Sequence, residues 1–319
     1  MNHKRKYAVM TAVSAILLML FAVLGQAAPA VTDADDKSGA VTESAAVQMT
    51  DGITAAADSS ENNAKSGSSV KKFFNNWLPY LVAGIANGGQ YALIAIGYTM
   101  VYGILRLINF AHGDIFMCAG LMMVYFSASL NIFISIPLVL ILTVLLGFLV
   151  ERLAYKPLRE APRMSVMISA IGVSYLLQNL AFYVTSGLAK QYPVIPFLSN
   201  SVSIGSVQVK TVTVVTPFLT IILILLLQLL IKKTKIGMAM RAVSFDFETS
   251  RLMGVKINSV ISMTFIIGSF LAAVGSVMFF SAYTTVTPTV GAMPGLKAFV
   301  AAVFGGIGSV PGAVIGAFI

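Results

Sequence analysis

Long apolar stretches alternate with short polar loops through most of the sequence. Residues 73–105 carry no charge and exceed the length of one membrane span, which takes about 20 apolar residues. Residues 115–150 are also uncharged, and Asn131 and Pro137 in this stretch predict two helices joined by a tight turn. Further apolar stretches predict spans at 164–187, 216–231, 261–282 and from 297 to 319. The pattern is that of an all-α polytopic membrane protein.

The loops between these stretches differ in charge, and the difference predicts their side of the membrane. The loops at 151–163 and 232–256 are rich in Lys and Arg, whereas the alternate loops hold only Lys190 and Lys210. Cytoplasmic loops carry the excess of basic residues, so the first two loops are assigned to the cytoplasm and residue 73 to the outside. Alternation of apolar and polar residues over 201–215 predicts a small hairpin on the outer side.

The first 72 residues have a different character. A basic start at residues 4–6, an apolar run at 8–24 and small residues at 25–30 are typical of a signal peptide, with a retained N-terminal membrane segment as the alternative. Residues 31–72 are rich in Ala, Ser, Asp and Gly, which predicts a disordered, acidic, extracytoplasmic tether. Residues 73–319 form the predicted transmembrane domain. Because the sequence stops inside an apolar run, we expect this domain to be truncated at its C-terminus.

Polar side chains interrupt the apolar pattern between residues 87 and 114. Charged and strongly polar groups are costly at membrane depth and often mark functional positions. They either line a translocation pathway, where irregular backbone is tolerated, or form an interfacial turn among lipid headgroups. The candidates for a pathway are Asn87, Gln90, Tyr91, Arg106, Asn109, His112 and Asp114.

The second basic loop, residues 235–258, combines charges with Met and Leu. This mixture predicts short amphipathic helices that end at a glycine C-cap. Such helices suit a groove on a soluble partner, although a solvated connector that packs on the bilayer has the same pattern. The residues of interest in the loop are Gly237, Arg241, Ala242, Asp246, Glu248, Arg251 and Gly254.

Glycine is concentrated near the end of the chain. Gly308, Gly312 and Gly316 recur at every fourth position, which permits close packing of one helix on another. Pro311 favours a different interpretation, in which a broken helix exposes backbone to a channel.

Composition excludes several other classes. The 319 residues are 57% hydrophobic and 10% charged, whereas soluble domains carry about 25% charged residues. The net charge of +9 resides in the topogenic loops and does not indicate nucleic-acid binding. One cysteine and two histidines provide neither a disulfide framework nor a His-rich metal site. The chain lacks a phosphate-loop motif and a G-x-S-x-G motif, so we expect neither an ATPase nor a hydrolase.

Three blocks of the sequence resemble a known family. They are NGGQYALIAIGYTMVYGILRLINFAHGD, GMAMRAVSFDFETSRLMGV and GLKAFVAAVFGGIGSVPGAVIGA. In this order they are similar to the permease subunit of bacterial branched-chain amino acid importers of the ATP-binding cassette (ABC) class, over about residues 75 to 319. The resemblance implies a multi-helix permease bundle with broken helices in the bacterial cytoplasmic membrane.

The resemblance also implies partners and roles. The chain would pair with a second homologous permease, two cytoplasmic ATP-binding subunits and an extracytoplasmic solute-binding protein, and it would hold no cofactor, since its partners bind ATP. The block at 87–114 matches the region taken to line the pathway, and the loop around Gly237, Arg241 and Gly254 matches the ATPase-coupling loop.

Two other functions stay open at this point. Residues 1–70 depart from the family pattern, and a related group of urea or amide permeases carries an exported extension, so the cargo is not fixed. An ion-coupled carrier or channel would instead need ionisable groups in its pathway, for which Arg106, His112 and Asp114 are candidates in the first half.

Overall fold

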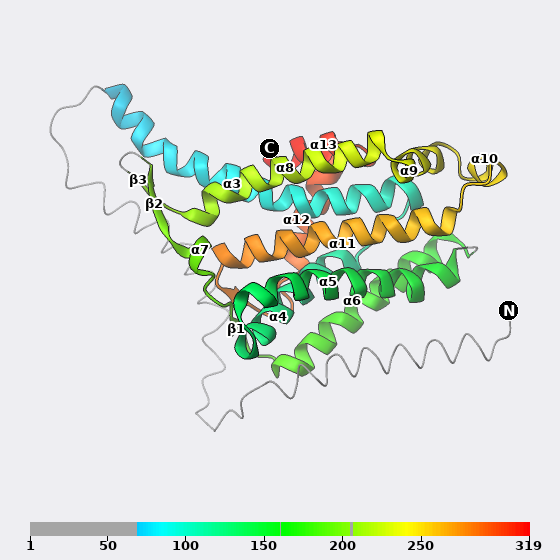
Figure 1. The fold of residues 1–319 in the computed structure, drawn as a ribbon, viewed down its shortest axis with the longest axis horizontal. Helices are drawn as coiled ribbons and strands as arrows, with labels where there is room; N and C mark the ends of the chain where they lie inside the picture. The colour runs from blue at the N-terminus through cyan, green and yellow to red at the C-terminus, as the bar shows by residue number, and fades with distance from the viewer. Residues whose placement is uncertain (1–68, 160, 205–206) are drawn as a thin grey trace. The chain divides into compact units, whose positions relative to one another are not determined.

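The computed structural model describes residues 69–159, 161–204 and 207–319, and these residues are largely helical (Figure 1). The predicted signal peptide at 1–30 lies outside the described residues, as does most of the predicted tether. The predicted tether at 31–72 overlaps helix α3, which begins at Ser69. The helices are α3 (Ser69–Leu105), α4 (Ala111–Ser129), α5 (Ile132–Val150), α6 (Arg163–Thr185), α7 (Pro196–Ser199), α8 (Thr211–Lys233), α9 (Lys235–Phe245), α10 (Phe247–Leu252), α11 (Ile257–Ala282), α12 (Ala292–Phe304) and α13 (Val310–Phe318).

Five of the described helices are long and apolar enough to cross a membrane, namely α4, α5 with its C-terminal extension, α6, α8 and α11. The extension consists of a π-helical turn, Glu151–Tyr155, and a 3-10 turn, Lys156–Leu158. These helices confirm the prediction of an all-α polytopic membrane protein. Helix α12 is apolar but shorter.

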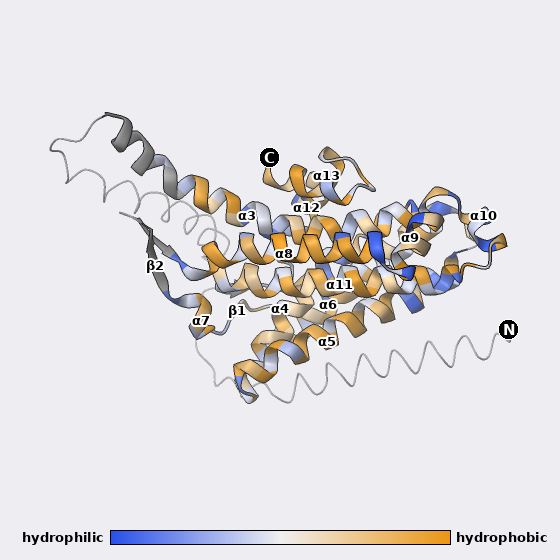
Figure 2. Cartoon of the chain, turned by 45° about the horizontal axis from the view of Figure 1, so that its top comes forward, coloured by the Kyte–Doolittle hydropathy of each residue, from blue (hydrophilic) through white to orange (hydrophobic). Residues whose placement is uncertain are grey.

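The core of the fold is formed by α4 and α11, which pack on each other and on α5. Within the protein, 78% of the α4 span and 67% of the α11 span are buried, against 22% for α6 and for α8. The faces that α5, α6 and α8 leave exposed carry Leu, Ile, Phe and Tyr, as lipid-facing helices do (Figure 2). Close approach of α4 and α12 depends on glycine, because a Cβ at Gly295 would lie 3.1 Å from the Gly113 Cα.

At one end of the helix bundle, the loops are joined by short strands. Helices α9 and α10 lie at the other end (Figure 1). Strand β1 (Lys190–Gln191) pairs antiparallel with β4 (Thr285–Val286), and β2 (Ser201–Ile204) pairs antiparallel with β3 (Val207–Lys210). The second pair is the predicted hairpin. It ends at Lys210 and does not reach residue 215, because α8 begins at Thr211.

Several predicted boundaries differ from the structure. The turn between α4 and α5 is at Leu130–Asn131 as predicted, and the Asn131 side chain caps α5 by accepting from the Phe133 N–H. Helix α3 is continuous through Gly88 and Gly89, and the chain breaks after Leu105 instead. The single span predicted for 297–319 is wrong, because α12 and α13 form two short helices. Their break is the glycine-rich segment 305–309, where Gly306 and Gly308 have positive φ, and Pro311 lies in the first turn of α13.

Candidate translocation and coupling site

Arg106, the first charged residue of the polar block at 87–114, directly follows the end of α3. Its φ of +56° is unusual for a residue with a side chain, and its N–H still donates to the Tyr102 carbonyl oxygen at 2.8 Å. The chain therefore turns sharply away from α3 at this position. The exposed guanidinium then reaches α9, where it donates to the Ser244 carbonyl oxygen at 3.2 Å. The structure thus joins two segments that the sequence had singled out separately.

The members of the block that follow Arg106 are buried between helices of this chain. The Tyr155 hydroxyl donates to the Asn109 side-chain oxygen at 2.8 Å. The His112 ring packs edge-on against Tyr98, with ring centroids 4.8 Å apart. These contacts hold the start of α4 against α3 and the π-helical turn.

Asp114 binds the neighbouring helix α6. Its carboxylate accepts hydrogen bonds from the Ser174 hydroxyl and from the Gln178 amide, the latter at 3.0 Å. Because Asp114 is buried, its carboxyl oxygens would be costly to leave without partners, and these two donors satisfy them. Asn109, His112 and Asp114 thus lie inside the helix packing, and Arg106 is the exposed charge of the block.

The candidates that precede Arg106 in the sequence lie in the middle of α3. Asn87 is half-buried and accepts a hydrogen bond from the Tyr283 hydroxyl at 3.2 Å, whereas Gln90 is buried. Tyr91 is half-buried, and the Lys297 ammonium lies 5.8 Å from its ring centroid. Sequence reasoning missed Lys297. The signal for it was available, because Lys297 is the one charged residue between Lys256 and the end of the sequence.

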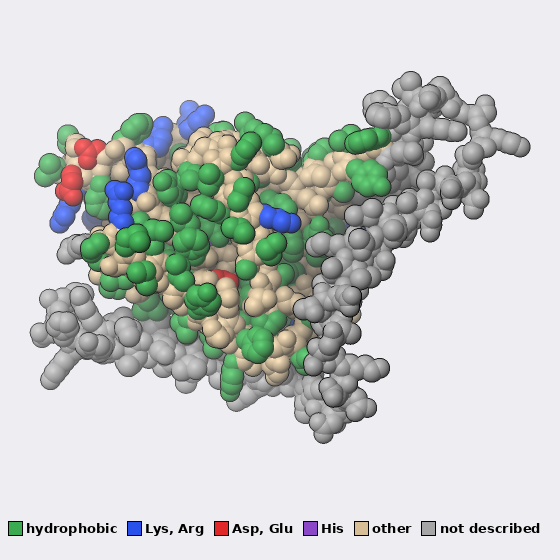
Figure 3. Space-filling model, turned by 180° about the vertical axis from the view of Figure 1, so that it is seen from behind, with side chains coloured by type: hydrophobic (Ala, Val, Ile, Leu, Met, Phe, Trp, Pro, Cys, Tyr) green, Lys and Arg blue, Asp and Glu red, His purple; other side chains and the backbone are tan. Residues whose placement is uncertain are grey.

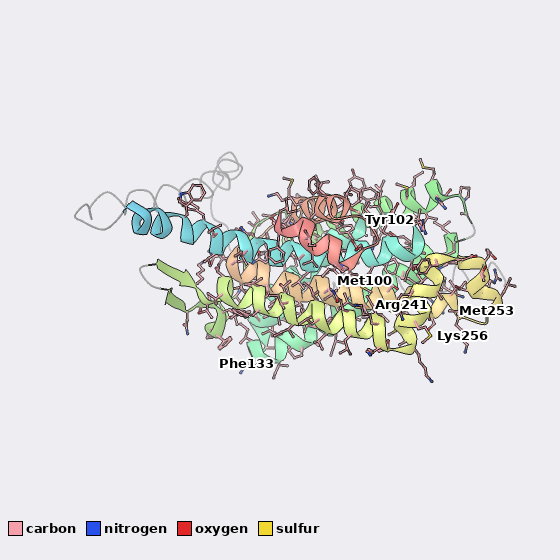
Figure 4. The ribbon with its side chains drawn as sticks, turned by 90° about the horizontal axis from the view of Figure 1, so that it is seen from above. Met100, Tyr102, Phe133, Arg241, Met253 and Lys256 are labelled. Atoms are coloured by element: carbon pink, nitrogen blue, oxygen red, sulfur yellow. The ribbon has the colours of Figure 1, made fainter. Side chains whose placement is uncertain are left out.

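A cavity of about 270 Å³ lies between the end of α3, α8, α9 and the segment that leads into α13. Met100 and Gly103 line it from α3, and Arg241 lines it from α9 (Figure 4). Gly308 lies in its wall and approaches Gly103, while Gly312 and Gly316 pack α13 on α12. The cavity therefore adjoins both the second basic loop and the glycine-rich break.

Two caps shape the second basic loop into helices. Thr234 caps α9 by accepting from the Gly237 N–H at 3.0 Å. Asp246 caps α10 by accepting from the N–H groups of Glu248 and Thr249 at 3.0 and 3.1 Å. Hydrogen bonds from the Thr249 hydroxyl and backbone hold the pKa of the Asp246 carboxyl below its usual value, so this cap is lost only as the pH falls through that lowered pKa. The left-handed Gly254, at φ +81°, then ends α10 as predicted.

The same two helices expose large apolar side chains. Phe245 is 88% exposed, Leu252 87% and Met253 80%. The charged residues Arg241, Glu248 and Arg251 are also exposed, and Ala242 is half-buried. Basic and acidic side chains gather at this end of the molecule, among exposed hydrophobic ones (Figure 3). An apolar patch rimmed by charges at a polar end of a protein is typical of a binding surface for another protein.

A second connection joins the first basic loop to α11. Glu151 is fully buried and forms an ion pair with Arg159, and it also accepts from the Ser262 hydroxyl at 2.8 Å. Arg159 in turn donates to the Asn258 side chain. Asn258 and Ser262 lie in the first two turns of α11, directly after the coupling-loop candidates. Among the described residues, no group of His, Cys, Asp and Glu is placed to hold a metal ion.

Comparison with known proteins places this arrangement in a family. Residues 80–319 match the family described as the permease component of the branched-chain amino acid transport system. The chain belongs to this family.

The curated relatives agree with this assignment over most of their length. The high-affinity branched-chain amino acid transport system permease BraD of Pseudomonas aeruginosa is 38% identical over 255 residues, which are 76% of this chain and 83% of the relative. The corresponding permease LivH of Escherichia coli is 37% identical over 262 residues, 77% of this chain and 84% of the relative. No solved structure matches the chain.

Proposed function

We propose that this chain is the permease subunit of an ATP-driven importer that carries branched-chain amino acids across the cytoplasmic membrane. Membership of the permease family and the 37–38% identity to relatives named for this transport support the proposal. The chain contributes the passage and not the hydrolysis of ATP, because its sequence lacks a phosphate-loop motif.

The exposed apolar face of α9 and α10 is the observation that carries the proposal. Phe245 ends α9, Leu252 ends α10 and Met253 follows it, and at this basic end all three side chains would be costly to leave in water. A groove on a cytoplasmic ATP-binding subunit would cover them, while Arg241 and Glu248 would contact its polar rim.

The contacts of α9 suggest how ATP binding reaches the passage. A shift of α9 acts on α3 through the Arg106–Ser244 hydrogen bond, and on the segment 308–311 through the cavity that Arg241 lines. Both targets are breaks in helical structure, which can take up a change in backbone angles. Nucleotide binding at the partner would therefore open and close the inner end of the passage.

Further subunits complete the proposed importer. A second homologous permease would form the other wall of the passage, a second ATP-binding subunit would dock on it, and an extracytoplasmic binding protein would deliver the cargo. The basic loops at 151–163 and 232–256 then face the cytoplasm, and the tail that precedes α3 lies outside.

A reconstituted importer tests the proposal. We expect vesicles with all subunits to accumulate leucine when ATP is supplied to the ATP-binding subunits, with no effect of a proton ionophore. Urea and ribose serve as competing cargoes. Uptake that persists without the ATP-binding subunits and collapses with the ionophore would establish an ion-coupled carrier instead, and selective uptake of urea would establish the other permease group.

Co-purification tests the docking surface. We expect Phe245→Ser and Met253→Ser to weaken binding of the ATP-binding subunit at least about tenfold, as loss of a central apolar anchor does. Phe133→Ser is the matched control, because Phe133 is 74% exposed and lies at the opposite end of the helices from Met253 (Figure 4). Unchanged binding in both loop variants would refute the assignment.

A further inference from the structure

Lys297 occupies an unusual position in the described part of the chain. It lies in the apolar helix α12 and is exposed, together with Met293, Leu296 and Val300 on the same helix. Lys297 is the one charged residue after Lys256 in the sequence. It lies in the second turn of α12, between strand β4 and the break at 305–309.

No carboxylate in the described part of the chain forms an ion pair with Lys297. Among the described residues, the ion pair found is Glu151 with Arg159, and the buried Asp114 is bound to Ser174 and Gln178. An unpaired ammonium facing lipid hydrocarbon is costly. The exposed side of α12 around Lys297 is therefore better suited to a water-filled passage than to lipid.

The neighbours of Lys297 form a small polar cluster on an aromatic base. Tyr91 lies beneath the ammonium, and Phe279 packs between Tyr91 and Tyr283, at 6.4 and 4.7 Å between ring centroids. The Tyr283 hydroxyl is hydrogen-bonded to the Asn87 side chain. The cluster thus combines one cation, hydroxyl and amide oxygens, and apolar side chains from α12.

We propose that Lys297 holds the carboxylate of the amino-acid cargo during its passage. This inference rests on the proposed function and adds the residue that meets the cargo. The groups match a zwitterion with an aliphatic side chain: the ammonium of Lys297 pairs with the carboxylate, the oxygens of Asn87 and Tyr91 accept from the cargo ammonium, and Leu296 and Val300 contact the aliphatic part.

Transport by the complete importer tests this role. Permease pair, ATP-binding subunits and loaded binding protein are assayed in vesicles of neutral lipid, with Lys297→Met, Lys297→Arg and the control Lys190→Met, which removes a lysine of the outer loops. At saturating binding protein, we expect Lys297→Met to lower the maximal rate of leucine uptake at least about tenfold, as loss of a charge-assisted hydrogen bond does. The concentration of binding protein at half-maximal rate stays unchanged, and Lys297→Arg recovers most of the rate.

The other outcomes separate the possible anions and the two proposals. If the Lys297→Met importer takes up leucine at the wild-type rate, the inference is overturned. The proposed function stands in that case, provided that the wild-type importer moves leucine when ATP is supplied. Loss of the second permease from the purified Lys297→Met complex would show that a partner's carboxylate, and not the cargo, meets Lys297. A defect that appears only when anionic lipid is added would assign the lysine to a lipid phosphate. Wild-type vesicles without ATP-driven uptake of any amino acid would refute the proposed function itself.

Discussion

The Arg106 guanidinium donates to the Ser244 carbonyl oxygen at 3.2 Å, although 138 positions separate the two residues. The bond joins the residue that follows α3 to the last turn of α9. Because it uses a backbone acceptor, it requires α9 to be helical and correctly placed, and it does not depend on the identity of residue 244. This hydrogen bond links the polar block at 87–114 directly to α9, the first of the two proposed coupling helices.

Replacement of Arg106 tests this link. We expect Arg106→Ala to leave ATP hydrolysis in the assembled importer within about twofold, since the residue does not reach the exposed face of α10, while leucine uptake falls about tenfold with loss of a charged hydrogen bond. Arg106→Lys should restore uptake only in part, because lysine lacks the planar fork that reaches Ser244. The ratio of leucine transported to ATP hydrolysed measures the effect, and an unchanged ratio would contradict it.

The loop residues Arg241 and Glu248 give a second prediction. Arg241→Ala and Glu248→Ala should reduce uptake without loss of the permease from the membrane, because both side chains are exposed and neither supports the core. Uptake in membrane vesicles, normalised to permease detected on the membrane, is the measurement. If both variants transport leucine at the wild-type rate, these two residues have no part in coupling.

The helices and loops of the fold could largely be predicted from the sequence, since they depend on local patterns. Asn131 marked the turn between α4 and α5, and Gly254 marked the end of α10, because each residue satisfies a backbone need at its own position. Apolar length and the placement of Lys and Arg likewise indicated spans and loops.

The parts that could not be predicted depend on contacts between distant residues. Asp114 was a pathway candidate in the sequence, but its partners Ser174 and Gln178 lie 60 and 64 positions away, on another helix. The 297–319 segment has the apolar length of a span. Pro311 favoured a broken helix in the sequence, and the positive φ values of Gly306 and Gly308 place the break before it. Lys297 gained significance when α3 and α11 placed Tyr91 and Tyr283 beside it.

Gly254 gives a prediction about backbone strain alone. A Cβ at this position would meet no other atom within 4 Å, so the effect of Gly254→Ala comes from its φ of +81°. We expect a loss of about 1–2 kcal/mol in local stability, seen as faster amide hydrogen exchange over 253–257. Gly254→Asn should be milder, because asparagine tolerates left-handed backbone. Gly172→Ala is the control: it also adds a methyl into open space, but in a helix, and should not speed exchange.

The buried Glu151 gives the last prediction, which concerns how α11 is held. Glu151→Leu leaves the Arg159 guanidinium without its partner and the Ser262 hydroxyl without its acceptor. Removing one member of a buried ion pair costs about 3–5 kcal/mol, and we expect about 2 kcal/mol here because Arg159 reaches the surface.

The double variant Glu151→Leu with Arg159→Met should recover most of this loss, since neither charge is then left alone. Thermal unfolding of the purified permease in detergent measures all four forms of the cycle. Equal losses for the single and double variants would show that Glu151 acts through packing. If the double variant is stable yet transports leucine slowly, the ion pair has a further role: it holds the first turns of α11, next to the coupling helices, in the position from which they move.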